Sequence, residues 1–210
     1  SVSPLSDAPF KAKCRVREIC MALGFSEAMH YSFLSEKELN DFDPREETKK
    51  QRLAIPDPVS AEYGVMRDSL LPQMYAALGR NASHQVETTM LFETGKVFNA
   101  GPVEKEMISL GLVGPVGREA LRRRAAVTEE EAVLWMKGAV EELIARLHAG
   151  HLEFVATEHP AFAKGAALQV KLNGKAIGVM GAVSAKLRHP FRLTTQMALC
   201  ELELKMLLKN

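Results

Sequence analysis

The chain has 210 residues, of which 47% are hydrophobic and 25% are charged, and its formal net charge is +1. This size and composition indicate a globular domain with one core, and the near-neutral charge gives no reason to expect a surface that coats DNA or a membrane. No apolar run approaches the roughly 20 residues that a membrane-spanning helix needs. Cys14, Cys20 and Cys200 are odd in number and lack a CxxC pair, so we expect a reducing, cytoplasmic setting without a disulfide framework or a zinc ribbon.

Residues 1–10 have the composition of a linker. They open with Ser-Val-Ser-Pro-Leu-Ser, and we expect them to connect a preceding module to one core domain over residues 11–210. The chain is therefore predicted to be a segment of a larger protein.

The first half of the chain is predicted to mix helices with short strands. Apolar residues at helical spacing, capping boxes and runs of β-forming residues mark these elements. In chain order they are a helix over residues 11–23, a strand over 26–34, a short polar helix opened by Ser35 and Glu38, a strand over 52–55, a helix over 70–82, and a strand pair over 88–98 that turns near Gly95.

The second half is predicted to be richer in strands. Its elements are a strand over residues 107–113, a long helix opened by Thr128 and Glu131 and ended by Gly150, a hairpin with a type I′ turn at Asn173-Gly174, and a strand in which Cys200 and Leu202 alternate with solvent-facing Glu201 and Glu203. Because strands outnumber crossover helices, the predicted fold class is α+β, an antiparallel β-sheet flanked by helices, most of them on one face.

Few residues in the chain point to catalytic chemistry. Glycines at 111, 114 and 117 follow a strand, but their spacing fits neither a P-loop nor a dinucleotide-binding fingerprint. His148 and His151 have a spacing that could hold a metal, although Gly150 between them favours capping of the helix end. We therefore nominate no catalytic, cofactor-binding or metal-binding residue.

Arg118, Arg122, Arg123 and Arg124 form the densest basic run. They could contact RNA phosphates, but no aromatic residues interleave with them to stack bases. A solvated loop is the simpler interpretation, and the four arginines are kept as candidate RNA contacts.

Several strings in the chain together resemble one family. Leu23-Gly24-Phe25-Ser26-Glu27 leads to His30-Tyr31-Ser32-Phe33, and Met66-Arg67-Asp68-Ser69-Leu70-Leu71-Pro72 is followed by Leu91-Phe92-Glu93-Thr94-Gly95-Lys96-Val97-Phe98. This order is similar to the catalytic-like core module of the β subunit of bacterial phenylalanyl-tRNA synthetase. The residues that carry the resemblance, for which structural roles are expected, are Pro58, Met66, Arg67, Ser69, Leu70, Pro72, Asn81, Phe92, Glu93, Gly95, Lys137, Gly138, His159 and Pro160.

The resemblance implies the core of a class II aminoacyl-tRNA synthetase without its catalytic motifs. The Phe-Arg-x-Glu string of class II enzymes is missing, since Phe191-Arg192, the only Phe-Arg pair, has Thr194 at the glutamate position. The family implies a non-catalytic module that packs against the catalytic α subunit in the (αβ)2 ligase, which uses ATP and magnesium to attach phenylalanine to its tRNA. No cofactor is expected in this segment.

Two alternatives stay open at this point. The loop over residues 118–124 could contact tRNA directly, or the chain could be a divergent class II-like ligase that binds ATP through Arg67 and Arg118. Packing against the α subunit predicts an apolar patch larger than a few hundred Å² on the helix over 11–23 or on the helix over 70–82. Asp57, where the family commonly has asparagine, is one of several departures that mark a divergent member.

Overall fold

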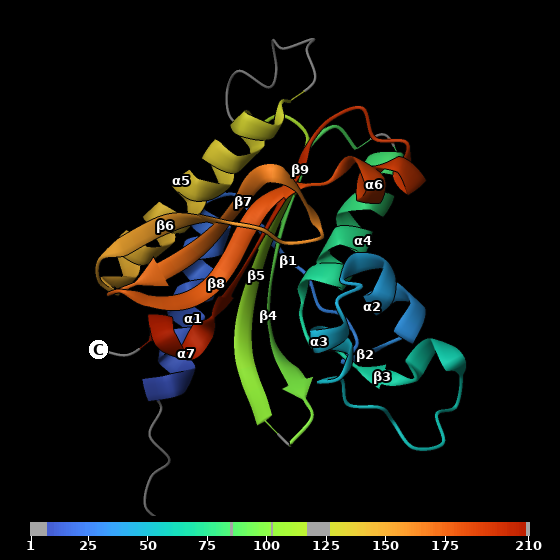
Figure 1. Ribbon diagram of the computed structural model, residues 1–210. Coiled ribbons are helices and arrows are strands. Elements are labelled where there is room, and N and C mark those ends of the chain that lie inside the picture. Colours follow the sequence, from blue (N-terminus) through green and yellow to red (C-terminus); the bar gives the residue numbers. More distant parts are fainter. Residues whose placement is uncertain (1–7, 85, 102, 117–126, 209–210) are drawn as a thin grey trace, which may run out of the picture.

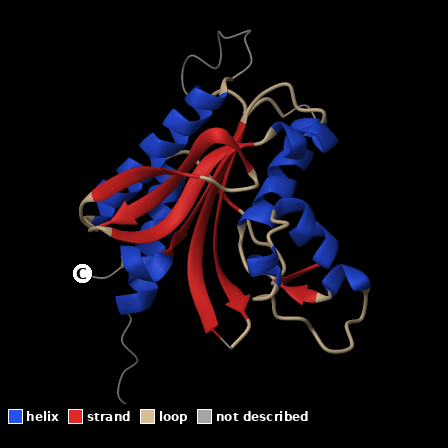
Figure 2. Cartoon of the chain, in the orientation of Figure 1, coloured by secondary structure: helices blue, strands red, loops and turns tan. Residues whose placement is uncertain are grey.

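The structure is a computed structural model that describes residues 8–84, 86–101, 103–116 and 127–208. Its main feature is a seven-stranded sheet in the order β1-β4-β5-β9-β8-β7-β6, accompanied by a small β2-β3 sheet (Figures 1 and 2). The strands are β1 (Ser26–Glu27), β2 (Phe33–Leu34), β3 (Val65–Met66), β4 (Thr89–Asn99), β5 (Val103–Val113), β6 (Leu152–Thr157), β7 (Phe162–Leu172), β8 (Lys175–Val183) and β9 (Met197–Glu203). The helices are α1 (Ala8–Ala22), α2 (Glu36–Phe42), α3 (Glu46–Lys49), α4 (Leu71–Ser83), α5 (Glu129–Leu147), α6 (Ala185–Arg188) and α7 (Leu204–Leu207), with 3₁₀ turns η1 (Ala61–Tyr63) and η3 (His189–Phe191).

The predicted fold class is confirmed, with one addition. Neighbouring strands of the large sheet run antiparallel, except that β1 pairs parallel to β4 at the edge. The two capping boxes are present, because the Ser35 and Thr128 hydroxyls accept the backbone N–H groups of Glu38 and Glu131. The hairpin turn is also confirmed, since Asn173 and Gly174 both have positive φ, as a type I′ turn requires.

The helices lie on both faces of the sheet, so the prediction that most lie on one face is wrong. Figure 1 shows α1 and α5 on one side and α4 with α2 on the other. Successive residues of a strand point to opposite faces, and in β9 Leu199 packs towards α4 while Cys200 packs towards α5. Each face therefore has its own apolar core. The alternation of apolar and acidic residues in β9 did not reveal this, because it was interpreted as one buried and one solvent-facing side.

The strand pair predicted over residues 88–98 is one continuous strand. β4 pairs with β5 from Thr89 opposite Val113 to Asn99 opposite Val103, so the chain does not turn at Gly95. Glycine occupies this position for a different reason. A Cβ atom at Gly95 would lie 2.3 Å from Nη2 of Arg67, and the missing side chain makes room for that guanidinium.

Other element boundaries differ because tertiary contacts decide them. The strand predicted over 26–34 is divided between two sheets, since β1 joins the large sheet and β2 joins the small one. The strand predicted over 52–55 is reduced to one bridge, between Ala54 and Val65. α1 begins at Ala8, and α5 ends at Leu147, where His148 adopts the left-handed conformation expected of the glycine at position 150.

Two glycines are expected to respond in opposite ways to replacement by alanine. A Cβ atom at Gly178 in β8 would lie 1.9 Å from the backbone oxygen of Glu201, whereas a Cβ atom at Gly138 in α5 meets nothing within 4 Å. Gly178→Ala should lower the free energy of unfolding by about 1–3 kcal/mol, because a backbone atom cannot step aside. Gly138→Ala should raise it by up to about 1 kcal/mol, because alanine favours the helix.

Urea unfolding followed by circular dichroism measures both changes. Equal effects of the two replacements would contradict the assignment of Gly178 to a close strand contact.

Candidate functional site

The Arg67-Asp68-Ser69 segment, which joins β3 to α4, holds the densest group of buried polar contacts. Arg67 is 3% exposed. Its Nη1 donates to Oε1 of Glu93 at 2.7 Å and to Oε1 of Gln73 at 3.2 Å, and its Nε donates to the backbone oxygen of Lys96 at 2.9 Å. One guanidinium thus ties the segment to β4 and to α4.

Glu93, on β4, is the acid at the centre of these contacts. It is 2% exposed, and its Oε2 lies 2.6 Å from Nδ1 of His30. Burial by itself opposes ionisation, but the hydrogen bond from His30 and the charge of Arg67 outweigh it and lower the pKa of Glu93. Glu93 is therefore an ionised carboxylate that is held between two partners.

Asp68 connects the same segment to the α2 side of the molecule. Its carboxylate accepts from Nε of Arg52 at 3.0 Å, and both side chains are buried. Arg52 also donates to Oδ1 of Asn40 and to the backbone oxygen of Asp43. Burial raises the pKa of Asp68 although Arg52 opposes this shift.

Ser69 connects the segment to β9. Its hydroxyl donates to Oε2 of Glu201 at 3.0 Å, and the Leu70 backbone N–H donates to Oε1 of the same carboxyl at 2.5 Å. The Ser69 oxygen also accepts the Leu71 N–H at the start of α4. Glu201 is 8% exposed, so the prediction that this position faces solvent is wrong, and burial raises the pKa of its carboxyl to about 7.

Glu93, Ser109 and Glu201 form one row across three neighbouring strands, which we call the polar row. Glu93 pairs with Ser109, and Ser109 pairs with Glu201. The Ser109 hydroxyl is buried and has no hydrogen-bond partner among the residues that the structure describes. Arg67 and Ser69 reach the two carboxyl groups, so the chain's own side chains lie over this part of the sheet.

Eight of the fourteen family-signature residues lie on the elements that form this cluster, although the Phe92 side chain packs in the core on the opposite face of the sheet. Met66, Arg67, Ser69, Leu70 and Pro72 lie on the segment or the first turn of α4, while Phe92, Glu93 and Gly95 lie on the strand beneath it. Sequence reasoning missed His30, Arg52, Asp68 and Glu201 as members. Only the alternation of acidic and apolar residues in β9 hinted at Glu201, and it suggested the solvent instead.

The remaining signature residues have separate structural positions. His159 packs against the rings of Phe42 and Phe162, and burial, with the nearby charge of Arg45, lowers its pKa to about 4 although Asp43 opposes this. The adjoining Pro160, together with Pro58, is exposed. The Asn81 amide donates to the Ala77 carbonyl within α4, and Lys137, next to Gly138, lies 5.1 Å from the centroid of the Phe154 ring.

The candidate RNA contacts Arg118, Arg122, Arg123 and Arg124 lie outside the described residues. Within the part of the chain that the structure describes, no group of three or more His, Cys, Asp or Glu side chains is placed to hold a metal ion. No helix in that part is long and apolar enough to cross a membrane.

A groove of about 1570 Å³ lies beside the Arg67-Asp68-Ser69 segment. Residues of α4 form its floor, α2, β2 and η1 line one end, and α6 with η3 line the other. The apolar patch predicted on the helix over 70–82 is not present, because the apolar side of α4 is buried. Exposed apolar side chains occur instead on α1, at Phe10 and Met21, and around the groove, at Met29, Tyr31 and Tyr63.

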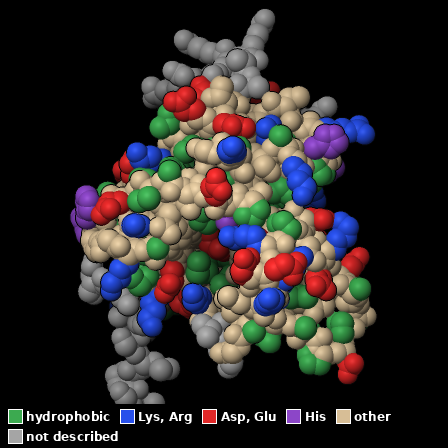
Figure 3. Space-filling view, viewed as in Figure 1, with side chains coloured by type: hydrophobic (Ala, Val, Ile, Leu, Met, Phe, Trp, Pro, Cys, Tyr) green, Lys and Arg blue, Asp and Glu red, His purple; other side chains and the backbone are tan. Residues whose placement is uncertain are grey.

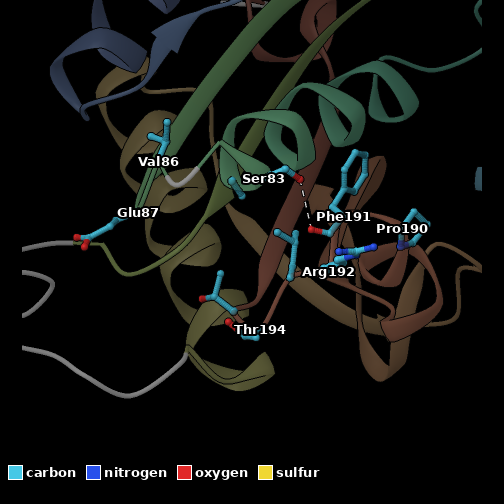
Figure 4. Close-up of a pocket in the computed structure, with 10 residues that line it drawn as sticks. Ser83, Val86, Glu87, Pro190, Phe191, Arg192 and Thr194 are labelled. Atoms are coloured by element: carbon cyan, nitrogen blue, oxygen red, sulfur yellow. Dashed lines mark hydrogen bonds between the residues drawn. The ribbon is translucent and has the colours of Figure 1, made fainter.

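A smaller hollow of about 870 Å³ lies at the C-terminal end of α4. Figure 4 shows Ser83 and Phe191 at its edge, with the Ser83 hydroxyl donating to the Phe191 carbonyl at 3.3 Å. Among the described residues that line it, Glu87 and Arg192 are the charged ones, with one charge of each sign. This hollow therefore has no net charge to attract an ion.

The arrangement of strands and helices is that of a class II-like aminoacyl-tRNA synthetase. It is similar to two structures from Desulfitobacterium hafniense. One, PylSc, described as a pyrrolysyl tRNA synthetase, has a TM-score of 0.73 with 14% identity over 96% of this chain and 66% of that one. The other, a pyrrolysyl-tRNA synthetase, has a TM-score of 0.74 with 12% identity over 95% of this chain and 67% of that one.

The particular family follows from the sequence comparison. The family model of the phenylalanyl tRNA synthetase beta chain CLM domain matches residues 4–204, and the chain belongs to this family. It is 31% identical over 92% of its length to the phenylalanine–tRNA ligase beta subunit of Shewanella oneidensis and 28% identical over 93% to that of Clostridium acetobutylicum. The chain spans 24% of the length of each of these curated relatives.

Proposed function

We propose that the chain is the non-catalytic core module of a phenylalanyl-tRNA synthetase β subunit. In this role it packs against the catalytic α subunit within the (αβ)2 enzyme that attaches phenylalanine to its tRNA, with ATP and magnesium used by the α subunit. Membership of the β-chain family and the class II-like fold support the proposal.

The burial of Arg67 is the observation that carries the non-catalytic role. Adenylation by a class II enzyme needs an arginine on the α-phosphate of ATP, and the alternative of an ATP-binding ligase would use Arg67 and Arg118, of which Arg118 lies outside the described residues. The Arg67 guanidinium is buried and already donates to Glu93, Gln73 and Lys96. A triphosphate would have to displace the buried Glu93 carboxylate, which would then lose its charged partner.

Phenylalanine-dependent ATP–pyrophosphate exchange tests the proposal. We expect no exchange with the chain alone, exchange with the α subunit in the full enzyme, and no change in that exchange when Arg67 is replaced by lysine in a complex that remains folded. Exchange by the chain alone would favour the ATP-binding alternative. So would a full enzyme that loses exchange when Arg67→Lys is introduced but remains folded.

The tRNA-contacting alternative has its own measurement. If Arg118, Arg122, Arg123 and Arg124 hold the RNA backbone, then replacing them with alanine should weaken tRNA binding by the full enzyme and flatten its salt dependence. An unchanged salt dependence would remove this alternative.

A further inference from the structure

The groove described above has one strongly apolar end, which we call the aromatic end. It is formed by Met29, Tyr31, Phe33 and Tyr63, which come from the β1–β2 connection, β2 and η1. Met29 is 91% exposed, Tyr31 70% and Tyr63 39%. Rings that are this open to water, on separate segments that converge, are typical of a surface that a partner covers.

The three rings of the aromatic end are already arranged as a rigid platform. The Tyr31 and Phe33 rings stack with centroids 5.6 Å apart, and Tyr63 meets the Phe33 ring edge-on at 5.3 Å. Because the rings contact one another, no space remains among them for a caged ligand. A partner must instead lie across their outer faces, which requires little reordering of side chains on binding.

Size and charge limit what can occupy the groove. Its volume of about 1570 Å³ exceeds the roughly 300–1,000 Å³ of ordinary small-molecule sites. The aromatic end is acidic in sum, because Lys37 there is paired with Asp41 and leaves Glu36, Glu38 and Glu62 as the excess charges, whereas Arg80 and Lys186 border the end near η3. Carboxylates beside the aromatic platform would repel a nucleic-acid backbone, so the two ends fit a protein segment that carries charges of opposite sign.

We propose that this groove docks a segment of the α subunit whose aromatic, proline or aliphatic side chain lies on the Tyr31–Tyr63 platform, flanked by a basic residue that faces Glu36 and Glu62. An acidic residue further along the segment faces Arg80 and Lys186. The proposal rests on the proposed function, because it names the surface through which this module meets its partner. Figure 3 shows hydrophobic side chains at the surface on the β2 and β3 side of the molecule, among interspersed acidic and basic ones.

The test uses the full-length β chain with the α subunit from the same source, and measures the Kd of the α–β complex by sedimentation or light scattering. Tyr31→Ser combined with Tyr63→Ser should raise the Kd about tenfold or more, as expected when an aromatic anchor is lost. Both side chains are exposed, so the fold should survive, and an unchanged Tm of the separate β chain checks this. Leu134→Ser changes an apolar side chain on α5 whose exposed fraction of 55% lies between those of Tyr31 and Tyr63, and it should leave the Kd within about twofold.

The outcomes separate this proposal from the proposed function. If Met21→Ser on α1 weakens the complex while the double tyrosine replacement does not, then the α subunit binds elsewhere, and the groove proposal falls while the proposed function stands. If the unmodified β chain does not bind the α subunit, both fall.

A charge reversal tests the chemistry of the occupant. Glu62→Lys should raise the Kd of the α–β complex several-fold at low salt and less at high salt, because it places a cation opposite the basic residue of the partner segment. If Glu62→Lys instead leaves the α–β Kd unchanged and tightens binding of tRNA to the full enzyme, then the groove holds nucleic acid, and the proposal is wrong.

Discussion

Replacing Arg67 with alanine is expected to lower the free energy of unfolding by about 3–5 kcal/mol, because it removes one partner of a buried ion pair. Glu93 would remain almost wholly buried with only His30 as a partner, and the Lys96 carbonyl would lose its donor. Burial of a charge without a partner costs far more than the pair itself contributes. Urea unfolding followed by circular dichroism or tryptophan fluorescence measures the change.

Two companion variants show whether the buried pair is responsible. Arg146→Ala breaks the half-exposed pair with Glu142 on α5 and should cost no more than about 0.5 kcal/mol. Arg67→Met combined with Glu93→Leu removes both charges and should be less destabilising than Arg67→Ala alone. If Arg67→Ala lowered the free energy of unfolding by less than about 1 kcal/mol, water would have to reach Glu93, and the cluster would not be excluded from solvent.

The free energy of unfolding is expected to fall by about 3 kcal/mol between pH 4.5 and pH 7 because of Glu201 alone. Burial raises the pKa of this carboxyl from 4.5 to about 7. Below pH 4.5 the group is protonated in both the folded and the unfolded chain. As the pH rises towards 7, the unfolded chain releases the proton while the folded chain retains it, so stability decreases and then becomes constant above about pH 7.

Glu201→Gln isolates this contribution from the other groups that titrate in the same range. An uncharged amide can still accept the Leu70 N–H through its oxygen, and its NH2 group takes the place of Oε2 beside the Ser69 oxygen. The variant should match the unmodified chain at pH 4.5 and be more stable than it at pH 8. Parallel stability curves for the two chains would show that Glu201 ionises at an ordinary pKa.

Local signals in the sequence were sufficient for elements whose cause is local. The capping boxes at Ser35 and Thr128 and the positive φ pair at Asn173-Gly174 act within a few residues, so their positions could be predicted. The prediction of a turn near Gly95 was wrong because the residue that requires glycine there is Arg67, 28 residues away along the chain. The same holds for the strand over 26–34, whose division depends on which sheet each half can join.

The sequence by itself determined the family, the α+β class and the presence of the Met-Arg-x-Ser-Leu-Leu-Pro string, because these depend on residue order and short-range periodicity. Only the tertiary structure decided what the string does. Arg67 and Ser69 could have been exposed residues that contact a ligand or buried residues that hydrogen-bond to other parts of the chain. Arginine and serine suit both roles, so the residue types alone do not distinguish them. The decision comes from β4 and β9, which place Glu93 and Glu201 under the segment. A buried polar group requires a partner, and such partners come from strands far apart in the sequence, where no local pattern records them.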